Sequence, residues 1–198
     1  MLRYAITDRG LFGGSLAAML DHLVGLAADV DYIQVRERDL DAAALETFSR
    51  QLVGACARLQ RGPQVLINHR ADVAIGCGAS GVHLRSFVGE LTPLQVRELY
   101  AVLGLAAPTV SISCHTLEEV RRARDFGANI ILFGPVYEKG SPANPGITGV
   151  GLEVLHHACE IAADVPVLAL GGVPAERISA CVDAGAAGVA AIRLFLQQ

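Results

Sequence analysis

The stretch Gly78-Ala79-Ser80-Gly81-Val82-His83-Leu84 joins the end of an expected helix to a short apolar strand. A related junction occurs twice more, at Gly127-Ala128-Asn129-Ile130 and at Gly185-Ala186-Ala187-Gly188-Val189. The first glycine of each junction supplies a left-handed residue that ends a helix, and the small residue after it permits a tight turn. Three such junctions predict a fold that repeats one strand–helix unit.

Short apolar runs recur along the whole chain and alternate with segments of helical periodicity. Each run is too short for a helix and too continuously apolar for a strand with one wet face, which is typical of parallel strands buried on both sides. The eight runs are Tyr4–Thr7, Tyr32–Val35, Gln64–Ile67, Val82–Leu84, Thr109–Ser113, Ile130–Phe133, Val167–Leu170 and Gly188–Ile192. The helical candidates are Leu16–Ala28, Ala42–Leu59, Ala71–Cys77, Pro93–Leu103, Leu117–Phe126, Leu152–Ala162 and Ala175–Ala184.

Eight strands with crossover helices predict one (β/α)₈ TIM barrel over residues 1–198, and an open doubly wound sheet is the competing architecture. Only Arg193–Gln198 follow the eighth run, so the eighth helix is expected to be shortened or missing. Either a second copy of the chain or the tail with a neighbouring helix covers that flank. We expect the homodimer.

Composition limits the class of protein. The chain has 198 residues, of which 52% are hydrophobic, and its formal net charge of −4 gives no reason to expect nucleic acid or a membrane surface as a partner. Five cysteines without a C-x-x-C spacing indicate neither a disulfide framework nor a zinc site. With no membrane-length apolar run and no basic-then-apolar leader, we expect a soluble, cytoplasmic protein.

The loops after the last two strands are the expected phosphate site, because barrel enzymes bind ligands at the carboxyl ends of their strands. Gly171 and Gly172 expose backbone N–H groups beside the start of a helix, and Ile192 and Arg193 offer further amides and a guanidinium. A tight turn that merely requires glycine is the alternative for Gly171 and Gly172.

Two further loops carry cationic side chains toward the same end. Gln34, Arg36 and Arg38 alternate onto one side of the second strand, where they form a predicted cationic cradle for an anion. The irregular stretch Phe133–Gly149 contains Lys139, the only lysine of the chain, and its length is typical of a lid, with a plain surface loop as the alternative.

Histidine supplies the candidate acid–base group. His115 ends the fifth strand and points toward the mouth, so we predict it as the catalytic residue. His83 lies inside an apolar run and is expected to be a hydrogen-bonded structural residue, while His156 and His157 fall on a helix away from the mouth. Cys114 faces the side opposite to His115, which argues against a nucleophilic cysteine.

Together these segments resemble the thiamine-phosphate synthase and TenI family over nearly the whole chain. The family has a (β/α)₈ barrel, is usually dimeric and acts on thiazole phosphate in thiamine biosynthesis, and the resemblance adds Asn68 and Ser113 to the expected ligand-binding residues. The matching segments are Tyr4–Asp8, Gln34–Arg38, Ile67-Asn68, Gly81–Leu84, Ser113–Thr116, Phe133–Tyr137 and Gly171-Gly172.

This chain departs from the synthase branch, which joins a pyrimidine pyrophosphate to thiazole phosphate with magnesium held by two aspartates. His69 stands in place of one aspartate, and Arg85–Val88 offers no carboxylate for the other. Lys139–Pro142 replaces the phosphate-loop pattern, and Arg38 replaces the usual lysine. Because Mg²⁺ needs oxygen ligands, these changes argue against ordinary synthase chemistry, and we expect no metal or cofactor.

The TenI branch, which tautomerises a thiazole carboxylate phosphate, is the closer resemblance. It implies that His115 moves the proton, that Gly172, Ile192 and Arg193 hold the phosphate, and that Arg36 and Arg38 meet the carboxylate. Arg193 stands where the family usually has serine. The alternatives are a thiamine-phosphate synthase that uses Mg²⁺ and a non-catalytic regulator that binds thiamine intermediates.

Overall fold

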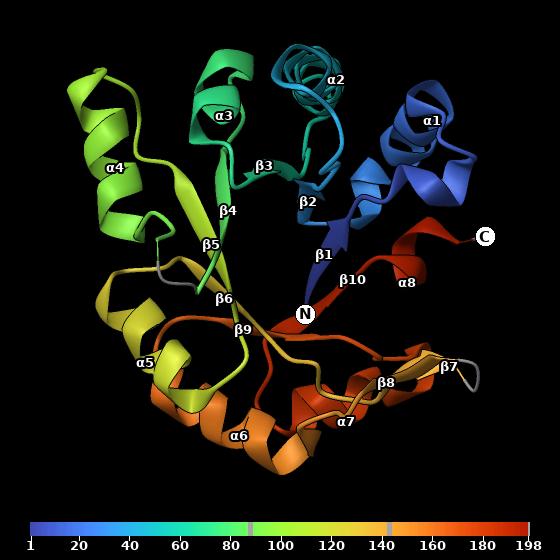
Figure 1. Ribbon diagram of the computed structural model, residues 1–198, viewed down its shortest axis with the longest axis vertical. Helices are drawn as coiled ribbons and strands as arrows, with labels where there is room; N and C mark the ends of the chain where they lie inside the picture. Colours follow the sequence, from blue (N-terminus) through green and yellow to red (C-terminus); the bar gives the residue numbers. More distant parts are fainter. Residues whose placement is uncertain (87–88, 142–143, 198) are drawn as a thin grey trace.

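A closed barrel of eight parallel strands forms the centre of the protein, for which a computed structural model describes residues 1–86, 89–141 and 144–197 (Figure 1). Around the barrel the strand order is β1-β10-β9-β6-β5-β4-β3-β2. The predicted TIM barrel is therefore confirmed. Its strands are β1 (Leu2–Ile6), β2 (Tyr32–Val35), β3 (Gln64–Asn68), β4 (Gly81–Arg85), β5 (Thr109–Cys114), β6 (Ile130–Phe133), β9 (Val167–Leu170) and β10 (Gly188–Ala191).

Seven helices surround the strands, and a short eighth follows the last strand (Figure 1). The second helix ends at Cys56 rather than at the predicted Leu59, and the seventh begins as a 3₁₀ turn over Ala175–Arg177. None of the described helices is both long enough and apolar enough to cross a membrane. The helices are α1 (Leu16–Leu26), α2 (Ala42–Cys56), α3 (Ala71–Cys77), α4 (Pro93–Val102), α5 (Leu117–Asp125), α6 (Gly151–Ala162), α7 (Ile178–Asp183) and α8 (Arg193–Leu196).

The stretch after β6, expected to be irregular throughout, contains a small antiparallel ribbon of β7 (Lys139–Ser141) and β8 (Asn144–Ile147). Lys139 pairs with Ile147 in this ribbon. The expectation of an irregular loop was wrong because two strands of three and four residues are too short to show a hydrophobic alternation.

The three repeated junctions have one geometry. Gly78, Gly127 and Gly185 have φ values of 70°, 75° and 101°, which L side chains rarely adopt. The alanine after each glycine donates its N–H to a carbonyl five residues earlier, at distances of 2.9, 2.9 and 3.0 Å. Each junction therefore ends its helix and delivers the chain directly into the next strand, as the sequence predicts.

The strands are buried on both faces. One hydrophobic cluster, which includes Ile33 and Val82, lies between the outer face of the barrel and the helices. A second and smaller cluster, which includes Tyr4, Leu66 and Leu132, fills the barrel interior. Because neither face meets water along most of each strand, polar side chains are left to the carboxyl ends of the strands or to buried hydrogen-bond networks.

The short α8 closes the flank that lacks a full eighth helix. Phe195 and Leu196 are both 4% exposed, and His22 of α1 donates an Nε2–H hydrogen bond of 2.9 Å to the Phe195 carbonyl. The Arg3 guanidinium lies 5.4 Å from the centre of the Phe195 ring. Within the chain, the tail and α1 cover this flank. From the sequence we had favoured a second copy of the chain as the cover, with the tail and a neighbouring helix as the alternative. The homodimer stays a prediction.

Truncating this tail contact should destabilise the barrel. We expect Phe195→Ala to lower the free energy of unfolding by about 3 kcal/mol, because it removes a buried ring and leaves a cavity between α1 and α8. Urea unfolding followed by circular dichroism measures this loss. The exposed Gln197→Ala is the control, and equal stabilities for the two variants would show that the tail does not close the flank.

Candidate functional site

Polar side chains from neighbouring strands meet at the carboxyl end of the barrel. Gln34 on β2 is only 2% exposed, and its Nε2 group donates a 2.9 Å hydrogen bond to Oδ1 of Asn68 on β3. The Gln34 Oε1 atom has no hydrogen-bond partner among the described residues. The structure thus brings together two of the predicted ligand-binding residues and leaves a buried acceptor between them.

A cationic rim, defined as Arg36, Arg38, His69 and Arg85, surrounds this pair. Burial lowers the pKa of Arg36 below its usual value, and the nearby positive charges of Arg38 and Arg85 lower it further. Neither Arg36 nor Arg38 forms a side-chain hydrogen bond or ion pair within the described part of the chain, so both remain available to an anion. His69 and Arg85 were not part of the predicted cradle, and the structure adds them to its two arginines.

A cavity of about 330 Å³ opens beside this rim. Three arginines, Arg38, Arg70 and Arg85, line it together with one acidic residue, Glu37, and with apolar residues that include Leu40 and Leu45. A ligand with an anionic group and an apolar body matches these walls.

One carboxylate partly neutralises the rim. The His69 Nδ1 atom lies 2.6 Å from Glu90 Oε2, and Arg85 Nε lies 3.6 Å from the same oxygen. Burial lowers the pKa of His69, and Glu90 partly offsets that effect. The expectation covered only Arg85–Val88, which holds no carboxylate, and Glu90 reaches the rim from just beyond that stretch. No sequence pattern indicated its position, and residues 87 and 88 lie outside the described residues.

This donor set does not fit Mg²⁺. The ion prefers near-octahedral oxygen ligands, whereas the rim offers guanidinium groups and an imidazole that already contacts its one carboxylate, Glu90. The amide oxygen of Asn68 is occupied by Gln34. In the described part of the chain, no three His, Cys, Asp or Glu side chains gather as a metal site.

A buried carboxylate outside the predicted set holds Arg36 in place. Glu37 is 6% exposed, and its Oε1 accepts a 2.6 Å hydrogen bond from the Thr7 hydroxyl at the end of β1. The Thr7 oxygen in turn accepts a 2.8 Å hydrogen bond from the Arg36 N–H. Arg9 adds its own N–H at 3.2 Å from Glu37 Oε2 and an ion pair to Asp39.

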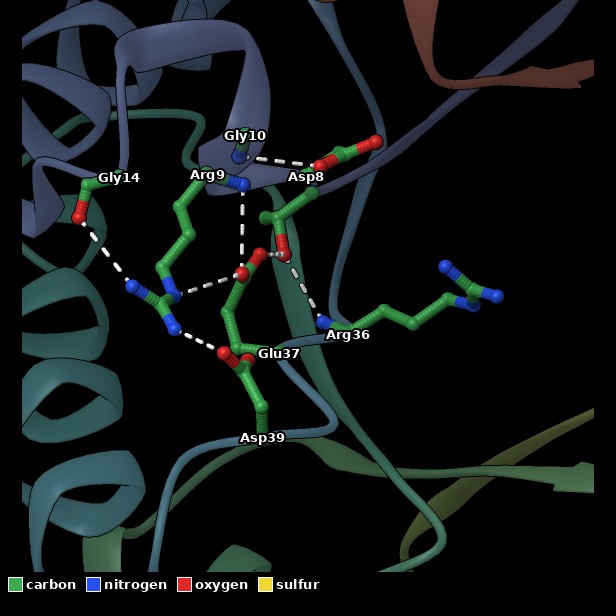
Figure 2. Close-up of polar contacts among 8 residues, drawn as sticks. Asp8, Arg9, Gly10, Gly14, Arg36, Glu37 and Asp39 are labelled. Atoms are coloured by element: carbon green, nitrogen blue, oxygen red, sulfur yellow. Dashed lines mark hydrogen bonds and ion pairs between the residues drawn. The ribbon is translucent and has the colours of Figure 1, made fainter.

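This network holds the backbone N–H of Arg36. Figure 2 shows Arg36 pointing away from the cluster of Arg9, Glu37 and Asp39. Sequence reasoning missed Glu37, although strand alternation alone places it on the side opposite to Arg36 and Arg38.

His115 lies at the end of β5 with a defined ring orientation. Its Nδ1 is 2.5 Å from the Gly134 carbonyl after β6, an oxygen that can only accept, so Nδ1 carries the proton. The neutral ring then has its lone pair on Nε2, as a general base requires. His115 is exposed at the same end of the barrel as the rim, and within the described part of the chain no hydrogen bond or ion pair links the two.

Cys114 and the other histidines discussed in the sequence analysis lie where the sequence predicts them. Cys114 is fully buried, and burial raises its pKa to about 12, which leaves the thiol unreactive. His83 is 3% exposed and hydrogen-bonds Ser111 and Ser113. His156 and His157 are exposed on α6 beside Glu160.

The predicted phosphate loops lie together, and their glycines have a structural explanation. A Cβ on Gly171 would meet Pro135 at 2.7 Å, and one on Gly172 would meet the Tyr137 and Glu138 carbonyls at 2.7 Å. The loop after β6 thus packs on this turn, and a 2.9 Å hydrogen bond from Val136 N–H to Leu170 O holds it there. Phosphate binding by Gly171 and Gly172 stays a prediction.

Three residues complete the predicted set. Ile192 is half-buried at the end of β10, and Arg193, the first residue of α8, is exposed, with no side-chain partner among the described residues. Lys139 belongs to β7, but its side chain lies outside the described residues. The expectation that Lys139 reaches a ligand stays a prediction.

Comparison with known proteins places the chain in a family. The sequence matches the family described as "Thiamine monophosphate synthase" over residues 3–195. It is 40% identical to a Geobacter sulfurreducens protein named "Putative thiamine-phosphate synthase", over 98% of this chain and 85% of the relative. It is 32% identical to a thiamine-phosphate synthase of Methanocella arvoryzae, over 98% of this chain and 87% of the relative.

A solved structure shows the same fold. The thiamine phosphate pyrophosphorylase from Pyrococcus furiosus superimposes with a TM-score of 0.79 at 22% identity, over 100% of this chain and 88% of that one. This likeness agrees with the barrel topology described above.

Replacing the buried carboxylate should test the network that orients Arg36. We expect Glu37→Gln to lower the free energy of unfolding by about 2 kcal/mol, since hydrogen bonds to a buried charge are lost. The control is Asp39→Asn, whose side chain is 70% exposed and which should cost about 0.5 kcal/mol or less. Chemical denaturation measures both, and similar losses would contradict a special role for Glu37.

Proposed function

The chain belongs to the thiamine monophosphate synthase family, and we propose that it tautomerises a phosphorylated thiazole carboxylate in thiamine biosynthesis. The observation that carries the proposal is the side-chain set of the barrel mouth. It offers cationic groups for anions and an oriented imidazole for proton transfer, whereas the Glu90 carboxylate contacts His69 and Arg85.

The proposed chemistry needs one group that first accepts and then returns a proton. His115 Nε2 removes a proton from one position of the thiazole ring, and the imidazolium returns it to another position. The Gly134 carbonyl holds Nδ1–H throughout, so the ring stays oriented and its positive charge is stabilised. Atoms and charge balance without a co-reactant.

The anionic ends of the substrate hold the ring in place. Arg36 and Arg38 are proposed to bind the carboxylate as paired guanidinium groups. Gly172, Ile192 and Arg193 are proposed to bind the phosphate, because the carboxyl ends of the last strands commonly do so in this fold. A small phosphorylated thiazole is therefore the proposed partner.

The names of the relatives favour a second candidate, thiamine-phosphate synthase, more strongly than they favour the tautomerase. In that reaction the thiazole nitrogen forms a bond to the pyrimidine methylene carbon, and pyrophosphate leaves with the electrons of the broken C–O bond. A rim of three arginines and a histidine suits a polyanionic leaving group, which is the structural support for this candidate.

Assays of both reactions decide between the candidates. For the tautomerase, ¹H NMR in D₂O should show conversion of the thiazole carboxylate phosphate at the same rate with Mg²⁺ and with EDTA. Formation of thiamine phosphate from the pyrimidine pyrophosphate and thiazole phosphate would instead establish the synthase. Ligand binding with neither turnover would identify a non-catalytic binder.

Removing the proton carrier should abolish turnover but not binding. We expect His115→Gln to lower kcat at least about 100-fold, the usual contribution of an acid–base group, and to leave thiazole phosphate affinity within about threefold. The control is His157→Gln, an exposed histidine on α6. Full activity of His115→Gln would contradict the assignment.

A further inference from the structure

Four polar side chains form a hydrogen-bonded line through the barrel interior. The Tyr4 hydroxyl on β1 lies 2.9 Å from Ser111 Oγ on β5, and Ser111 Oγ lies 2.8 Å from His83 Nδ1 on β4. His83 Nε2 lies 2.9 Å from Ser113 Oγ. Tyr4 and Ser111 are fully buried and Ser113 is half-buried near the mouth, so the line runs from the sealed interior to the candidate site.

The protons of this line can be counted. Burial raises the pKa of Tyr4, so the phenol keeps its proton, and burial lowers the pKa of His83 to about 3, so the imidazole is neutral and carries one N–H. The ionisable groups that act on His83 from neighbouring strands are His69 and Arg36, and both disfavour its protonation. Each of the four side chains therefore has one hydrogen to donate.

Only one arrangement satisfies every buried hydrogen. Within the described residues, Tyr4 and Ser111 have no acceptors besides each other and His83 Nδ1. If Nδ1 carried the proton, one of the two hydroxyl hydrogens would be buried without an acceptor, at a cost equivalent to roughly tenfold or more in population. Nδ1 must therefore accept, and Nε2–H must donate to Ser113.

From this arrangement of donors and acceptors we infer that Ser113 keeps its hydroxyl hydrogen free to donate to a ligand in the barrel mouth. His83 Nε2–H takes one of the two lone pairs of the Ser113 oxygen, and the hydroxyl hydrogen is left to donate to a ligand atom that accepts, such as an unprotonated ring nitrogen or an anionic oxygen. Tyr4, Ser111 and His83 are positioning residues that, from inside the barrel, leave the Ser113 hydrogen free to donate.

The inference assigns Ser113 a role distinct from that of His115. Ser113 lies in β5 and His115 directly follows that strand, two positions further along the chain, so we infer that one ligand at the mouth meets both residues. The binding experiment with thiazole phosphate, given below, rests on the proposed function. The polarity of the line, meaning the direction of its hydrogen bonds from Tyr4 to Ser111 to His83 Nδ1 and from His83 Nε2 to Ser113, does not.

The test is the tautomer of His83, read from long-range ¹H–¹⁵N correlation spectra of protein labelled with ¹⁵N-histidine. Replacing the other five histidines by glutamine, one at a time, assigns the His83 signals without altering the line. We expect a protonated Nε2 and an acceptor Nδ1, unchanged from pH 8 to pH 5. A protonated Nδ1, or titration near the ordinary histidine pKa of about 6.5, overturns the inference.

A matched pair of double variants tests the cause of the polarity. Tyr4→Phe with Ser111→Ala removes both partners of Nδ1 and should yield a mixture of the two His83 tautomers. Tyr100→Phe with Ser49→Ala removes two buried hydroxyls that have no hydrogen-bond partner, and should leave the Nε2–H form intact. A single Nε2–H tautomer in both would show that Tyr4 and Ser111 do not set the polarity.

Calorimetry with thiazole phosphate tests whether the Ser113 hydroxyl donates a hydrogen bond to the ligand. We expect Ser113→Ala to weaken binding about 3- to 10-fold, the effect of one lost hydrogen bond, and Ser49→Ala to leave it unchanged. Equal affinities would show that the Ser113 hydrogen does not face the ligand. Failure of the unmodified protein to bind would contradict the proposed function alone, because the His83 spectra decide the polarity by themselves.

Discussion

Exclusion of water from both faces of the barrel strands is the constraint on which the structure depends. A polar group inside such a barrel must find its partner among other side chains, because an unpaired buried group is costly. Tyr4, Ser111 and His83 meet this requirement in the interior, and Thr7 and Glu37 meet it between β1 and β2. At the carboxyl ends of the strands, the buried Gln34 Oε1 atom has no partner among the described residues, and there a ligand can replace the missing water.

The same constraint explains how the mouth acquires its charge. Glu37 accepts hydrogen bonds from Thr7 and Arg9, and with Asp8 it offsets only part of the effect that burial and the neighbouring arginines have on Arg36. Glu90 contacts the rim at His69 and Arg85. The proposed binding of an anionic ligand therefore relies on guanidinium groups and backbone amides.

Much of the fold was predictable because its signals are local. Eight apolar runs and the glycines at 78, 127 and 185 indicated the barrel, since helix ends and buried parallel strands each have a sequence signature. Strand alternation also placed Gln34 and Arg36 at the mouth. The role of Glu90 was not predictable, because its contact with His69 depends on the path of a loop, and the closure by Phe195 depends on packing against α1.

The central claim is that the mouth binds its anionic ligand without a divalent ion held by side chains. Manganese binding, followed by the electron paramagnetic resonance signal of free Mn²⁺, tests it most directly. The account predicts no stoichiometric Mn²⁺ site in the protein, either alone or with thiazole phosphate present. A saturable site that disappears in Glu90→Gln would contradict the account.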